Sequence, residues 1–148
     1  MTRVLLIILS IFLFTSCEDS DSLFGPPSDV ADNIFDHINH YRLMSGLEVL
    51  EKHPDLNQLA SDHAEDMAQN ENVSHFNQTF RYNYVVEELS MSKYAEIVEE
   101  GDLYGRDLIE KWSNNEDLES VIIGDYKYIG IGVHGSGDEL YATIIFTK

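Results

Sequence analysis

Apolar side chains recur at intervals of three or four residues in three parts of this 148-residue chain. This spacing puts them on one side of a helix, so it predicts three amphipathic helices that pack on a common layer. Ser28 or Asp29 is expected to cap the first helix, Pro54 suits the first turn of the second, and Asp102 is expected to cap the third. Gly46 is expected to end the first helix.

Two segments near the C-terminus, 126–133 and 140–146, are rich in β-branched and aromatic residues. The glycine-rich stretch 135–138 between them is typical of a hairpin turn. Gly130 and Gly132 leave one face of the first strand bare, which lets a helix or a neighbouring backbone approach closely. The sequence therefore predicts a hairpin with a closely packed cover.

The middle of the chain has no clear period. Residues 76–84 are aromatic and polar, and we expect a long ordered loop that lines a site. Residues 85–89 suit a short strand, whereas residues 91–100 are compatible with a helix or a loop. The order of helices and strands predicts an α+β fold.

The N-terminus has the features of an export signal. Residues 1–16 combine a positive start with an apolar run that is too short to span a membrane. Small residues then lead to Cys17, a pattern that resembles a bacterial lipoprotein signal with lipidation of this cysteine. A lone cysteine excludes an intramolecular disulfide. Residues 17–27, acidic and then proline-rich, are predicted to form a tether to a domain at 28–148.

Charge excludes one class of partner. The chain has 27 acidic and 9 basic side chains, a formal net charge of −18. Such a surface is repelled by nucleic acid and by anionic lipid headgroups, so nucleic acid is not an expected partner. The expected membrane contact is the N-terminal lipid.

Residues spread over most of the chain resemble the CAP superfamily (cysteine-rich secretory proteins, antigen 5 and pathogenesis-related 1 proteins, with an SCP-like domain), specifically its bacterial branch without disulfides. The resemblance covers roughly residues 30–147, and its joint spacing is more specific than any single motif. It rests on these residues: Asn39, Arg42, Gly46, Leu50, Leu56, Ala60, His63, Ala64, Met67, Ala68, Ser74, His75, Trp112 and 129–133. It implies an α-β-α sandwich around a small antiparallel sheet.

The resemblance also implies a cleft with histidines and acidic residues, which in some relatives holds a divalent cation. His75 matches the first histidine and Glu87 the acid, but no histidine follows Trp112 where the second one is usual. His75 and Glu87 supply only two ligands, fewer than zinc normally takes. Asp117 or Glu119 is a candidate for a further oxygen ligand, which favours a harder cation. Zn²⁺, Mg²⁺ and Ca²⁺ thus remain candidate cofactors.

The other histidines are expected to be structural. His63 lies on the apolar side of the second predicted helix, where a packed, hydrogen-bonded histidine is the usual finding. His37 and His40 are three residues apart, but no third ligand is evident. His134 lies near the hairpin turn and is not expected to replace the missing histidine.

Three functions are compatible with these features. The favoured one is an exported, lipid-anchored, non-enzymatic binding module on the outer membrane or cell surface, with a cleft around His75 and Glu87 for a lipid, peptide or glycan. A cation-dependent hydrolase that uses the same two residues is the second, although no nucleophile motif is present. The third is a structural or adhesive surface protein with a vestigial cleft. The sequence leaves ligand, membrane face and oligomeric state open.

Overall fold

A computed structural model describes residues 27–136 and 139–148 of the chain. The predicted signal sequence, the lipidation site Cys17 and the tether up to residue 26 lie outside the described residues. Pro27 is the first residue of the first helix. Among the described residues, no helix is long and apolar enough to cross a membrane.

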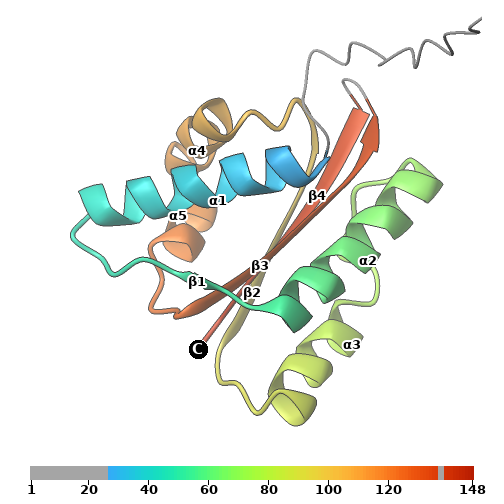
Figure 1. The fold of residues 1–148 in the computed structure, drawn as a ribbon, viewed down its shortest axis with the longest axis horizontal. Helices are drawn as coiled ribbons and strands as arrows, with labels where there is room; N and C mark the ends of the chain where they lie inside the picture. The colour runs from blue at the N-terminus through green and yellow to red at the C-terminus, as the bar shows by residue number, and fades with distance from the viewer. Residues whose placement is uncertain (1–26, 137–138) are drawn as a thin grey trace, which may run out of the picture.

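A four-stranded sheet lies between two layers of helices (Figure 1). One layer holds α1 (Pro27–Met44), α4 (Gly105–Ser113) and α5 (Glu116–Ile122). The other holds α2 (Pro54–Asn70), α3 (Gln78–Asn83) and the π-helical turn η1 (Tyr84–Glu88). This arrangement confirms the predicted α+β sandwich.

The sheet is mixed. Its strand order is β1 (Glu51–Lys52), β3 (Tyr128–Ser136), β4 (Glu139–Thr147) and β2 (Tyr94–Gly101). The predicted hairpin β3–β4 forms its centre, and β2 pairs antiparallel with β4. The two-residue strand β1 runs parallel to β3, so the prediction of a purely antiparallel sheet is wrong at this edge.

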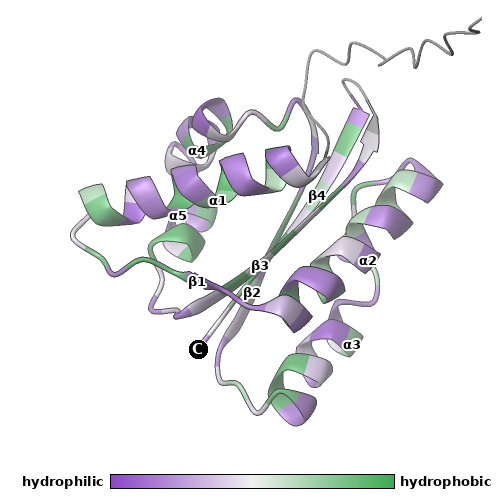
Figure 2. Ribbon diagram, in the orientation of Figure 1, coloured by the Kyte–Doolittle hydropathy of each residue, from purple (hydrophilic) through white to green (hydrophobic). Residues whose placement is uncertain are grey.

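The hydrophobic core lies on both faces of this sheet. The larger cluster joins α1, α4 and α5 to side chains such as Ile131, Ile144 and Phe146. The smaller one joins α2 and η1 to Ile145. Figure 2 shows the central strands as mainly apolar, in agreement with their burial on two sides. This double burial explains why β3 and β4 appear in the sequence as nearly continuous apolar runs.

The two strand glycines bring α2 close to the sheet, as predicted. A Cβ atom on Gly130 would lie 2.2 Å from the backbone carbon of Leu56, and one on Gly132 would lie 2.2 Å from the backbone nitrogen of Ser61. No side chain fits at such distances. The helix backbone therefore rests directly on β3, and His63 is pressed against the sheet.

Arg42, one of the residues on which the family resemblance rests, connects α1 to α5 in the helix layer on the other side of the sheet from α2. Its side chain is buried and donates hydrogen bonds to the carbonyl oxygens of Glu48, Ile122 and Gly124, at 3.0, 2.8 and 2.9 Å. Burial lowers the pKa of this guanidinium from its ordinary value. Because Glu48 follows α1 and the other two partners lie at and just after the end of α5, Arg42 ties the exit of α1 to the segment between α5 and β3.

Three sequence predictions in the middle of the chain are wrong. Residues expected to form a loop at 76–84 contain α3, and the strand expected at 85–89 is the turn η1. The segment 91–100, which suited a helix or a loop, contains most of β2. Helix α5 has no counterpart among the predicted elements, and Asn115 caps it by accepting hydrogen bonds from two backbone N–H groups. Short helices stabilised by tertiary contacts have little periodicity of their own.

Candidate functional site

A buried carboxylate, Glu96 on β2, is the centre of the candidate site. Arg81 on α3 donates from Nε to Glu96 Oε2 at 2.6 Å and from Nη2 to Glu96 Oε1 at 2.8 Å. The hydroxyl of Tyr94 donates to Oε2, and Nδ1 of His75 lies 2.8 Å from Oε1. Four donors thus surround a carboxylate that has about four acceptor positions.

These contacts keep Glu96 ionised. Burial by itself raises the pKa of Glu96, but hydrogen bonds from Arg81, Tyr94 and His75 more than offset it, and the pKa lies below its ordinary value. Burial, together with the hydrogen bond to Glu96, raises the pKa of Tyr94, so the phenol stays protonated. A carboxylate with every acceptor position used has no lone pair left for a metal ion or a substrate proton.

His75 lies at the surface above this cluster, with 49% of its side chain exposed. Because ionised Glu96 can only accept, His75 carries a proton on Nδ1 and presents Nε2 to the surroundings. Arg81 also donates from Nη1 to the carbonyl oxygen of Phe76 at 2.7 Å, which holds the segment after His75 in place. His75 is therefore an oriented, accessible imidazole.

His63 lies beneath the cluster, packed as the sequence predicts. Its Nδ1 is 2.9 Å from the hydroxyl of Thr143 on β4, and its Nε2 is buried without a hydrogen-bond partner among the described residues. Burial and the charge of Arg81 lower the pKa of His63. The neutral imidazole is the stable form here, in keeping with a structural role.

Three aromatic side chains of the segment that follows His75 are exposed. The exposed fractions are 63% for Phe76, 65% for Phe80 and 46% for Tyr82. Tyr82 packs edge to face against Tyr94, with ring centroids 5.8 Å apart. Each of the three lines a different hollow: Phe76 lies beside Met67, Phe80 beside Glu87, and Tyr82 beside Tyr94. The exposed side chains of this segment, His75, Phe76, Phe80 and Tyr82, are together called the aromatic face below, although they do not form one continuous surface.

Comparison with known proteins decides the family. Residues 35–147 match the cysteine-rich secretory protein family, CAP. The chain belongs to the CAP family. No match was found among the curated proteins.

Three solved structures share the CAP fold with this chain at low identity. An outer surface protein from Borrelia burgdorferi has a TM-score of 0.73 and 19% identity over 84% of this chain and 96% of its own. An extracellular SCP-domain protein from Bacillus anthracis has a TM-score of 0.70 and 20% identity over 84% of this chain and 45% of its own. A cysteine-rich secretory protein from Staphylococcus aureus has a TM-score of 0.66 and 20% identity, over 82% and 39%. The chain spans less than half of the latter two.

The acid beside His75 in this CAP domain is Glu96, whereas sequence matching selects Glu87. Glu87 lies exposed on η1 and lines a separate surface hollow of about 340 Å³ with Phe80, Tyr84 and Glu88. Residues 85–89, which suited a short strand in the sequence, overlap the π-helical turn η1, and Glu87 is exposed there. The run Tyr94 to Val98, in which one acid interrupts apolar residues, was the signal for Glu96.

The other proposed oxygen ligands also lie apart from His75. Asp117 and Glu119 belong to α5, in the helix layer across the sheet, and Glu119 accepts a hydrogen bond from Tyr41 of α1 at 2.6 Å. Within the described ranges, no group of three or more His, Cys, Asp or Glu side chains is placed to hold a metal ion. His134 bonds to the hydroxyl of Ser61 at 3.0 Å.

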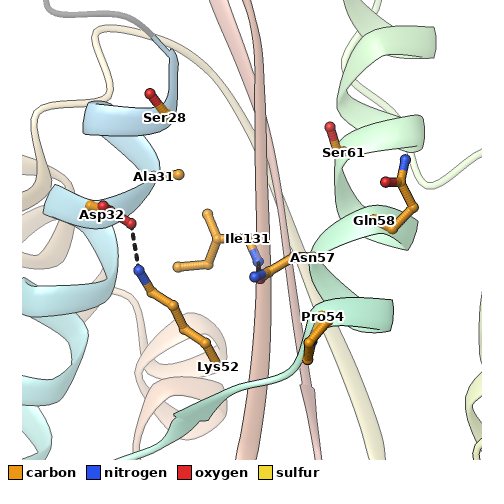
Figure 3. A pocket seen from close by; sticks show the side chains of 9 residues that line it. All are labelled: Ser28, Ala31, Asp32, Lys52, Pro54, Asn57, Gln58, Ser61 and Ile131. Carbon is orange, nitrogen blue, oxygen red and sulfur yellow. Dashed lines mark hydrogen bonds and ion pairs between the residues drawn. The ribbon is translucent and has the colours of Figure 1, made fainter.

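A second hollow, of about 460 Å³, lies between α1 and α2 (Figure 3). Its polar side chains already have partners: Lys52 pairs with Asp32, and Asn57 accepts a hydrogen bond from the N–H of Ile131 at 3.0 Å. The remaining polar side chains are hydrogen-bonded in the pairs Ser28–Asp29, Gln58–Asp62 and Ser61–His134. Since its polar groups hold the protein together, this hollow is a weaker candidate than the aromatic face.

Proposed function

We propose that this chain is an exported, lipid-anchored CAP protein that acts as a non-enzymatic binding module. The observation that carries the proposal is the aromatic face: Phe76, Phe80 and Tyr82 stay exposed on a short segment held by the buried Arg81–Glu96 pair. Exposed aromatic side chains on a rigid support are typical of interaction surfaces.

The position of this face suits a protein anchored at its N-terminus. The start of α1 and helix α3 lie at opposite ends of the molecule (Figure 1). With a lipid on Cys17, this separation would leave α3 accessible to external ligands. The outer surface and extracellular proteins among the similar structures agree with this address.

The state of Glu96 favours binding over catalysis. Its carboxylate is saturated by Arg81, Tyr94 and His75, so it is a poor base and a poor metal ligand. A cation-dependent hydrolase would also need Glu87 next to His75, whereas Glu87 lines another hollow. A surface protein with a vestigial cleft differs from our proposal because its aromatic face would bind nothing.

The test compares two variants that each remove exposed apolar groups. Phe80→Ser/Tyr82→Ser alters the aromatic face, and Leu43→Ser/Met44→Ser is the matched control at the end of α1, where the side chains are 58% and 76% exposed. The purified proteins are applied to a peptide array, a glycan array and phosphatidylcholine vesicles. We expect one ligand class to bind the parent and the control, and to bind the Phe80/Tyr82 variant at least about tenfold more weakly.

Two results would overturn the proposal. One is the absence of binding in all three ligand classes, or equal binding by both variants. The other is hydrolysis of ester or phosphoester substrates in Zn²⁺, Mg²⁺ or Ca²⁺ that disappears in His75→Ala.

A further inference from the structure

Strand β2, which carries Glu96, forms one edge of the sheet. It pairs with β4 over all eight residues, Tyr94–Gly101, and has no strand on its other side among the described residues. At the opposite edge β1 already covers the start of β3. An unpaired edge presents a row of N–H and C=O groups that can pair with another chain.

The hydrogen bonds of β3 show which β2 groups point outward. The carbonyl of Ile129 accepts a hydrogen bond from the N–H of His53, and the N–H of Ile131 donates to the side chain of Asn57. The main-chain groups of Ile129 and Ile131 therefore point away from β4. Because backbone groups alternate along a strand, Gly130 and Gly132 pair with β4.

The same alternation carries across β4 to β2. Thr143 and Ile145 are the β4 partners of those glycines, so their main-chain N–H and C=O groups point to β3. The main-chain groups of Ile144, between them, therefore point to β2, where Ile97 is the partner. The N–H and C=O groups that point to the outer edge therefore belong to Tyr94, Glu96, Val98 and Glu100.

Two independent observations agree with this assignment. The N–H of Glu100 bonds to the side chain of Glu99 at 3.3 Å, which a group paired to β4 would not do. Glu96 retains 9% exposure although its side chain has 0%, so its exposed surface belongs to the main chain. The outer main chain of β2 is thus reachable by a ligand.

The first part of this edge adjoins the aromatic face. A hollow of about 290 Å³ between α3 and β2 is lined by Gln78, Thr79, Tyr82, Tyr94 and Ala95. Its carboxamide and hydroxyl groups can bond to a polar ligand, and the exposed ring of Tyr82 can receive a cation. A strand laid along β2 would bring one of its side chains to this hollow.

The acidic residues near β2 indicate which kind of strand could pair with it. Glu100 lies exposed at the end of β2 and Asp102 follows the strand directly, whereas Glu99, with its side chain 14% exposed, already pairs with Lys111 at 2.9 Å. A second copy of this chain, with its net charge of −18, would bring the same acids against one another. Acidic edges of this kind resist self-pairing but attract a basic partner.

We propose that the ligand of the aromatic face is an extended basic peptide that adds to the sheet as a strand beside β2, with a side chain in the hollow at Tyr82. This inference rests on the proposed function and names the ligand class of the same surface. Main-chain hydrogen bonds to Glu96 and Val98 supply affinity, and the acids and the hollow supply selectivity.

The experiment uses the purified full chain and a defined probe, acetyl-Lys-Val-Lys-Val-Lys-Val-Lys-amide, with a Glu-for-Lys peptide as the charge control. Amide hydrogen exchange is followed residue by residue. We expect the lysine peptide to slow exchange at Glu96 and Val98 at least about tenfold, because these N–H groups gain partners, and to leave Ile97, already bonded to β4, unchanged. The glutamate peptide is expected to bind at least about tenfold more weakly.

Two controls separate strand pairing from simple charge attraction. N-methylation of two adjacent residues in the middle of the peptide blocks both of its edges and is expected to abolish binding. In the protein, Val98→Pro removes an outward N–H that β4 does not use, whereas Val98→Thr keeps it. We expect the proline variant to lose binding and the threonine variant to retain it, with circular dichroism to verify folding; the methylated peptide tests the same point without altering the protein.

The inference is overturned if the lysine peptide does not bind, or if it binds without protecting Glu96 and Val98. It is also overturned if these amides become protected only as protein concentration rises, because the occupant is then a second copy. If the peptide fails while Phe80→Ser/Tyr82→Ser still abolishes binding of another ligand class, the strand-pairing inference fails and the proposed function stands.

Discussion

The buried pair of Arg81 and Glu96 offers the sharpest test of how this fold is held together. The side chains are 4% and 0% exposed and share two hydrogen bonds, at 2.6 and 2.8 Å. Glu96→Leu leaves the guanidinium buried without its anion, and Arg81→Met leaves the carboxylate without its cation. Loss of one partner of such a pair typically costs about 3–5 kcal/mol.

The magnitude matters because a domain of this size is marginally stable, by about 5–15 kcal/mol. Each single variant is therefore expected to lower the melting temperature by roughly 10–20 °C. The double variant Arg81→Met/Glu96→Leu removes both charges, so it is expected to lose less than the sum of the single losses, by about 2 kcal/mol or more.

The assay is urea unfolding followed by circular dichroism. The free energy of unfolding is calculated with the same dependence on urea concentration for every variant. Arg106→Met is the matched control, since Arg106 pairs with Asp107 at the surface with side chains 73% and 64% exposed. Its loss is expected to leave the free energy of unfolding nearly unchanged, because solvent and salt screen an exposed ion pair. The reasoning is refuted if the buried single variants behave like this control, or if the double variant loses the full sum.

Three further predictions follow from the same structure. Gly132→Ala is expected to cost about 1–3 kcal/mol in urea unfolding, because the added carbon meets the α2 backbone at 2.2 Å, and unchanged stability would contradict the contact between α2 and β3. Because the pKa of His63 is lowered in the folded state, its unfolded form binds a proton more readily near pH 6; stability is expected to be full above about pH 6.5 and to fall as the pH drops toward the folded pKa. Urea midpoints at pH 7.5 and 5.5 should then converge in His63→Leu, and an equal pH dependence in parent and variant would argue against His63 as the cause. Millimolar Zn²⁺, Mg²⁺ or Ca²⁺ is expected to leave the melting temperature unchanged, since the described residues bring no three candidate ligands together, and a rise that His75→Ala removes would reveal a cation site.

Long periodic segments were predictable from the sequence because their pattern reflects a single packing surface. Helices α1 and α2 show an apolar stripe, and the β3–β4 hairpin shows strand composition around glycines. Even the close approach of α2 followed from Gly130 and Gly132, since a missing side chain in a strand leaves room for a backbone. The packed position of His63 followed from its place on the apolar stripe.

The segment 76–100 shows the opposite case. Helix α3 keeps Phe80 and Tyr82 exposed and buries Arg81. Its apolar residues are therefore outside and its charged residue inside, the reverse of what a hydrophobic pattern predicts. The burial of Arg81 is possible only because Glu96 meets it from β2, fifteen residues later. No periodicity encodes such a pairing.

The sequence by itself determined the sandwich fold, the family and His75 as an accessible candidate, because these depend on local pattern and on spacing along the chain. The tertiary structure alone decided which acid bonds to His75, since the pairing of β2 with β4 brings Glu96 to its Nδ1, while Glu87 on η1 lines a hollow with Phe80 and Tyr84. It also decided that the carboxylate is saturated and that one strand edge stays open. Both are properties of neighbours distant in sequence, and the physical reason is that burial, hydrogen-bond partners and sheet order exist only once the chain has folded.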